Sequence, residues 1–244
     1  MGGGASAFVP NNSIEGQGDE VLALQRKIKL SDKEINKYWA AFCKADKLHT
    51  GCIHIDDFHR HYQLEETPFT KKVFSLMDSD GSGGINFYEY ILAIWNYLSL
   101  DLNSLASFSF RLFDTDDSKL MDMDEIQHMI SCVYGGVGSN ERVQKVMDKM
   151  QPENGESITV NEFVTYSRQY PLLLYPAFAM QNVLRRSIFG DAYWEAVSAE
   201  RAKNMLDKTI FDILEEQAAN QRNQGRDTPA EYFKEMNAHS RQVG

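Results

Sequence analysis

Residues 78–89 have the sequence DSDGSGGINFYE, and residues 114–125 have the sequence DTDDSKLMDMDE. In both stretches, positions 1, 3, 5, 7, 9 and 12 of a twelve-residue loop offer an oxygen atom, and position 7 does so through its backbone carbonyl. Calcium takes about six to eight oxygen ligands, so a short loop must fold around the ion to supply them. The spacing therefore predicts two calcium ions per chain, each held between two helices.

The loop at residues 78–89 matches this pattern at every ligand position. Its candidate ligands are Asp78, Asp80, Ser82, the carbonyl of Gly84, Asn86 and Glu89. Glu89 is the expected bidentate ligand, and Gly83 permits the positive φ at which such a loop turns. Asn86 should also N-cap the following helix, and Ile85 should face the core and pair with a neighbouring loop. A surface turn rich in Asp, Gly and Ser would not require Glu89 and Ile85 in register.

The loop at residues 114–125 departs from the pattern at one position. Its candidate ligands are Asp114, Asp116, Ser118, the carbonyl of Leu120, Asp122 and Glu125. Lys119 replaces the glycine at position 6, and a residue with a Cβ pays roughly 1–2 kcal/mol in the left-handed region. Four acidic ligands compensate with strong attraction, so we still expect binding. Asp122, at position 9, admits magnesium as a competitor.

Two further stretches keep the frame of the loop and lose its ligands. Residues 46–57 have Leu48 at position 3 and the short Asp57 at position 12, and residues 151–162 begin with Gln151. An ion in either loop would lack ligands, so we expect both to be metal-free. They can still contribute Ile53 and Ile158 to short two-strand bridges with the intact loops.

Helix signals surround the four loops, which form an internal repeat. Ser31 and Glu34 make a capping box, Thr67 and Pro68 open another helix, and an apolar helical pattern follows at residues 105–113. Sustained alternation typical of strands is absent, which favours an all-α fold. The segments expected are a flexible N-terminus (1–18), a first lobe (19–100, with loops 46–57 and 78–89), a second lobe (101–170, with loops 114–125 and 151–162) and a helical extension (171–244).

On these loops the chain resembles the EF-hand superfamily and, within it, the four-hand calcineurin-B-like and recoverin-like sensors. The resemblance covers roughly residues 31–170 and is specific at two loops. It implies a two-lobed helical protein that exposes an apolar groove and grips an amphipathic partner helix. Calcineurin B itself is expected to have four intact loops, whereas this chain has two and adds residues 171–244.

The extension has helix signals of its own. Pro176 can start a helix that Gly190 ends, and a longer helix should carry an apolar stripe of Ala202, Leu206, Ile210, Ile213 and Leu214. These helices could enlarge the core, occupy the groove of a lobe or dock on another protein. We expect residues 176–219 to dock on the lobes with four side chains inward: Met180, Leu184, Ile210 and Leu214.

Composition excludes several other classes of protein. A net charge of −10 argues against nucleic acid as a partner. The three cysteines form no C-x-x-C pair, which argues against a disulfide scaffold and favours a reducing cytoplasm. No nucleophile elbow, phosphate loop or H-E-x-x-H motif occurs, so we do not expect an enzyme. His49, His54, His59 and His61 could form a zinc site, or they are polar residues of a partly exposed helix.

The first six residues, MGGGAS, fit the N-myristoylation pattern with Gly2 as the acceptor. One acyl chain anchors weakly, and no basic patch follows, so any membrane contact would be weak without a partner. The alternative is a flexible start. We therefore expect a cytoplasmic calcium sensor or regulatory subunit that couples calcium to a protein partner. The alternatives are a cytoskeletal or ciliary component tuned by calcium, and a calcium buffer.

Overall fold

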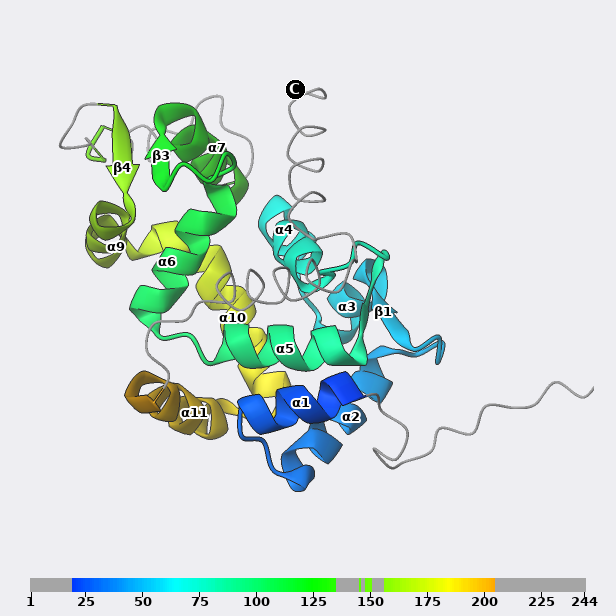
Figure 1. Cartoon of the computed structure of the whole chain (residues 1–244). Helices are drawn as coiled ribbons and strands as arrows, with labels where there is room; N and C mark the ends of the chain where they lie inside the picture. Colours follow the sequence, from blue (N-terminus) through cyan, green and yellow to red (C-terminus); the bar gives the residue numbers. More distant parts are fainter. Residues whose placement is uncertain (1–18, 135–144, 146–147, 151–155, 205–244) are drawn as a thin grey trace, which may run out of the picture.

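The computed structural model of the 244-residue chain describes residues 19–134, 145, 148–150 and 156–204. These residues form an all-α fold with two small antiparallel sheets, as expected (Figure 1). The helices are α1 (Asp19–Lys27), α2 (Asp32–Ala45), α3 (Ile55–Tyr62), α4 (Pro68–Met77), α5 (Phe87–Leu98), α6 (Leu102–Phe113), α7 (Met123–Tyr134), α9 (Val160–Gln169), the 3-10 helix η1 (Pro171–Leu174), α10 (Tyr175–Ser187) and α11 (Asp191–Asn204). The strands are β1 (Cys52–His54), β2 (Gly84–Asn86), β3 (Leu120–Asp122) and β4 (Ser157–Thr159). No helix of this described part is long and apolar enough to cross a membrane.

The two sheets are the expected bridges between loops. Strand β1 pairs with β2 so that Ile53 lies opposite Ile85, and β3 pairs with β4 so that Met121 lies opposite Ile158. All four of these side chains are fully buried. Each bridge thus joins one loop with a complete ligand set to one that lacks it.

The helix starts follow the local signals in the sequence. Capping boxes begin α2 at Ser31, α4 at Thr67 and α5 at Asn86, where Glu89 is the third helical residue. In such a box two backbone N–H groups that have no partner within the helix are satisfied by side chains. The start of α5 is therefore fixed by the same residues that are candidate metal ligands.

Helix α5 is buried on almost every side, since Tyr88 alone of its residues is half-buried and the others are buried. A helix that is apolar all round must be covered all round. Contacts with α1, α2, α4 and α10 provide this cover. The first lobe is therefore completed by helices from outside its two helix–loop–helix units, and α10 is one of them.

The described part of the extension packs on the lobes, and α10 crosses α5 (Figure 1). Met180 and Leu184 are buried, as expected, whereas Ala202 is exposed. Helix α10 ends before Gly190, whose φ is +88°. The other residues expected on the apolar stripe or inward, Leu206, Ile210, Ile213 and Leu214, lie outside the described residues, as do Gly2 and the first five positions of loop 151–162.

Candidate metal centres

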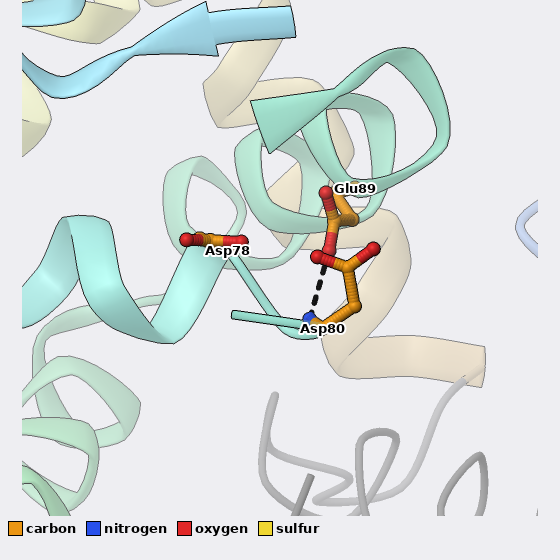
Figure 2. Close-up of side chains that lie close together, drawn as sticks. All are labelled: Asp78, Asp80 and Glu89. Carbon is orange, nitrogen blue, oxygen red and sulfur yellow. Dashed lines mark hydrogen bonds between the residues drawn. The ribbon is translucent and has the colours of Figure 1, made fainter. Parts of the chain in front are cut away.

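Three carboxylates meet in each of the two loops with complete ligand sets. Asp78, Asp80 and Glu89 place oxygen atoms within 4.8 Å of one another, and so do Asp114, Asp116 and Glu125. In Figure 2, Asp80 and Glu89 face each other with Asp78 beside them. Within the described ranges no other cluster of three such side chains lies this close, and neither cluster includes a histidine. Hard oxygen ligands at this density suit calcium or magnesium.

The loop backbone is shaped by its first aspartate. The carboxylate of Asp78 accepts hydrogen bonds from the amides of Ser82 (3.0 Å) and Gly83 (2.9 Å). Gly83 has a φ of +89°, as expected for position 6. A Cβ on the next residue, Gly84, would lie 3.1 Å from Cβ of Cys52, so the close approach of β1 favours glycine there. The loop pattern predicts only that the carbonyl of Gly84 is a ligand, and it does not predict this packing against β1.

The loop at residues 114–125 repeats this arrangement without the glycine. The carboxylate of Asp114 accepts hydrogen bonds from the amides of Ser118 (3.0 Å) and Lys119 (3.1 Å). Lys119 has a φ of +65°, so the lysine does adopt the left-handed conformation that its position demands. The left-handed conformation predicted at this position is therefore present, and it has not prevented the carboxylates from gathering.

Glu89 is held in place through both of its oxygens. Its Oε1 accepts from the amide and the hydroxyl of Ser79 (both 2.8 Å) and from the amide of Asp80 (3.2 Å), which is the dashed line in Figure 2. Its Oε2 accepts from the amide of Asn86 (3.0 Å). Glu125 is bonded in the same way to the amide and hydroxyl of Thr115. The hydroxyl residues at position 2 were missed by sequence reasoning, although both loops carry one.

Both carboxylate clusters contain buried groups whose ionised form is disfavoured when no cation is bound. Burial raises the pKa of Glu89, Asp78 and Asp114, and hydrogen bonds from loop amides only partly oppose it. Asp116 is exposed, and hydrogen bonds from Ser118 lower its pKa. A divalent cation among these groups would stabilise the ionised carboxylates that burial penalises. The donor set and its electrostatics therefore both fit such an ion.

The remaining candidate ligands lie on the same loops and take part in their internal hydrogen bonds. The hydroxyls of Ser82 and Ser118 donate to the carbonyls of Gly84 (3.0 Å) and Leu120 (2.8 Å). Asn86 and Asp122 accept from the amides three residues on and so cap α5 and α7: Glu89 (3.0 Å) and Glu125 (2.9 Å). The side chains at position 9 therefore serve as helix caps in this structure.

The loop at residues 46–57 has the same backbone and no carboxylate cluster. Asp46 accepts from the amides of Thr50 (3.0 Å) and Gly51 (2.8 Å), and Gly51 has a φ of +86°. At position 3, however, Leu48 is 73% exposed, and Asp57 at position 12 is paired with Arg60 (2.9 Å).

The described half of loop 151–162 also contains no cluster of three carboxylates. Glu162 accepts hydrogen bonds from the amide and hydroxyl of Thr159 (2.7 and 2.6 Å) and so caps α9. Two of the histidines near the first loop make hydrogen bonds within the fold. His59 is buried against the hydroxyl of Thr70 (3.0 Å), and His54 donates to the carbonyl of Gly83 (3.1 Å).

No family model matches the chain, but several curated proteins do. Calcineurin B of Naegleria gruberi is 30% identical over 158 residues, which are 62% of this chain and 89% of that protein. Calcineurin B type 2 of Mus musculus is 25% identical over 118 residues, 48% of this chain and 66% of that protein. Calcineurin B type 2 of Dictyostelium discoideum is 20% identical over 132 residues, 54% of this chain and 72% of that protein.

Proposed function

Because the chain belongs to the calcineurin B family of EF-hand proteins, we propose that it is a calcium sensor or regulatory subunit that couples calcium occupancy to the binding of a protein partner. The observation that carries the proposal is the pair of three-carboxylate clusters, each enclosed by its own loop. The relatives are named as subunits of calcineurin, which supports a role in binding another chain rather than a catalytic role.

Two calcium ions are proposed, one in each loop with a complete ligand set. In each loop the side chains at positions 1, 3, 5 and 12 and the carbonyl at position 7 would bind directly, and position 9 would bind through a water. Magnesium is the expected competitor, above all at Asp122. The partner would present an amphipathic helix to an apolar groove. The proposed location is the cytoplasm, where myristoylation of Gly2 would add weak membrane contact.

Calorimetric titration with calcium tests this function directly. Two ions should bind, taking the formal charge of the chain from −10 to −6. Titration in excess magnesium measures the competition. Four ions, or none, would refute the proposal. A second experiment is an affinity pulldown with and without calcium, in which a protein partner should be captured only when calcium is present.

A structural role in a cytoskeletal or ciliary assembly is the second candidate. The observation that favours it is loop 46–57, which keeps its backbone hydrogen bonds without the ligands, because a scaffold needs the fold more than the ion. Sedimentation with a filament fraction regardless of calcium would support this candidate. Partner binding that requires calcium would support the sensor.

A further inference from the structure

The first described half of the extension lies across both lobes. The 3-10 helix η1 contacts α6, α7 and α9, and α10 contacts α3, α4, α5 and α6. The side chains that α10 buries are spaced as one helical face: Ala177, Met180, Gln181 and Leu184. An amphipathic helix that lays its apolar face on the helices of a lobe is a recurring mode of peptide recognition. Here the helix belongs to the same chain.

A polar contact fixes this helix at the carboxyl end of α5. The last carbonyls of a helix have no partner within it. Gln181 Nε2 donates to the carbonyls of Tyr97 (2.8 Å) and Leu100 (3.1 Å). Arg185 Nε donates to the carbonyl of Leu98 (2.8 Å), and its Nη2 donates to that of Leu100 (3.1 Å). The extension therefore caps α5 from outside.

Arg201, on α11, adds a second point of attachment. Its Nη1 donates to the carbonyl of Asn96 (3.0 Å) and to the hydroxyl of Ser99 (2.6 Å), and its guanidinium lies 5.0 Å from the centroid of the Trp95 ring. Arginines at a helix carboxyl terminus also interact favourably with the helix dipole. We call Gln181, Arg185 and Arg201 the latch.

Helix α5 thus joins the latch to a candidate metal centre. Its first turn carries Glu89, and its last carbonyls hold the latch. Moreover, α10 contacts both α4 and α5, which flank the loop at residues 78–89. In sensor EF-hands calcium changes the angle between two such helices and opens an apolar groove. A helix seated on both of them must respond to that angle.

We propose that α10 is a built-in ligand of the first lobe, and that its docking and calcium binding at residues 78–89 strengthen each other through α5. The inference rests on the calcium binding proposed above. A tethered helix has an effective concentration on the order of millimolar, so an outside partner must displace α10. Such a partner would carry an apolar helical face with a Gln or Arg that reaches the same carbonyls, and calcium favours it over α10 when its coupling to the loop at residues 78–89 is the stronger of the two.

The test uses the full chain with the latch removed. Arg185→Ala combined with Arg201→Ala is compared with Arg186→Ala, because the Arg186 side chain is 75% exposed and pairs with Asp191 at 3.5 Å. Each of these variants also carries Glu125→Gln, and so does the reference chain, which we call the parent chain. Calcium titration of these chains then reports on the loop at residues 78–89. Hydrogen exchange of the α10 amides reports docking, and calorimetry reports calcium affinity. Gln181→Ala is the second variant, which removes two hydrogen bonds and no charge.

Loss of the latch should speed exchange in α10 and weaken calcium binding by about 5-fold or more, the low end of ordinary coupling between sites. Arg186→Ala should match the parent chain in both. Unchanged exchange in both latch variants would overturn the docking, and faster exchange with unchanged calcium affinity would overturn the coupling. If the parent chain binds no calcium, the proposed function fails with the coupling, whereas the exchange measurement still decides the docking.

Discussion

The loops at residues 46–57 and 78–89 share a backbone and differ in their carboxylates. Both begin with an aspartate that accepts two loop amides, both turn at a glycine with positive φ, and both contribute a strand to the same sheet before a helix begins. At the ligand positions they differ in the kind of ligand offered at 3, 9 and 12, where Leu48, His54 and Asp57 stand in place of Asp80, Asn86 and Glu89. The shape of the loop therefore depends on positions 1, 6 and 8, and its candidate ion depends on positions 3, 9 and 12, of which only 3 and 12 contribute a carboxylate to the cluster at residues 78–89.

The largest effect should come from removing the carboxylate at position 12 of the loop at residues 78–89. Glu89→Gln removes the charge of a side chain that is 3% exposed and bonded through both oxygens. Calcium binding at residues 78–89 should fall by more than about 100-fold, since even outer partners of metal ligands are worth 10–100-fold. Calorimetry should then show one ion per chain in place of two.

The matched control for this substitution is Glu66→Gln, an exposed glutamate paired with Lys71 at 3.4 Å. It should leave both ions in place. If Glu89→Gln still binds two ions, position 12 does not decide occupancy, and the comparison of the two loops fails.

The reverse change should create a site in the first loop. Leu48→Asp with Asp57→Glu supplies the two missing carboxylates on a backbone that already has the turn. Leu48 is exposed, so its replacement removes no core packing. We expect a third, weaker calcium ion by calorimetry. Leu48→Asn with Asp57 unchanged is the control, and it should bind no third ion.

The local parts of this comparison could be predicted from sequence alone. Ligand spacing, the glycine at position 6 and the capping box at Asn86 act over a few residues, so a single stretch contains them. The pairing of Ile53 with Ile85 followed from the repeat itself. The ion pair between Asp57 and Arg60 could not be predicted, because it depends on side-chain rotamers that the spacing of residues does not specify.

The placement of the extension could be predicted only in part. The apolar face of α10 was visible, but its attachment depends on contacts between residues far apart in the chain. Tyr193 donates to Glu34 on α2 (2.9 Å), and Phe189 packs edge-on against Tyr38 with ring centroids 4.8 Å apart. A usable signal was the almost wholly apolar stretch at residues 87–98, because such a helix requires cover on every side.

The loop at residues 114–125 allows the role of position 6 to be measured. Lys119→Gly should relieve roughly 1–2 kcal/mol of left-handed strain and cost about 0.5–1 kcal/mol in chain entropy. The net effect should be a gain of about 0.5–1 kcal/mol in unfolding free energy, measured by denaturant titration. Lys47→Gly is the control, since Lys47 is exposed and its φ is not positive. Equal destabilisation by both substitutions would show that Lys119 is not strained.

The smallest effect should come from the side-chain hydrogen bond that joins the loop at residues 46–57 to the loop at residues 78–89. His54, in the loop without ligands, donates from Nδ1 to the carbonyl of Gly83 at an exposed position (3.1 Å). His54→Ala removes this hydrogen bond beside the proposed carbonyl ligand Gly84. The expected loss is about 0.5 kcal/mol, the low end for one hydrogen bond, or roughly a 2-fold weaker calcium affinity at residues 78–89. His54→Asn keeps an N–H donor and should retain the affinity of the parent chain. Equal weakening by Ala and Asn would mean that the imidazole acts by packing, and no change in either would mean that the first loop supports the second through its strand alone.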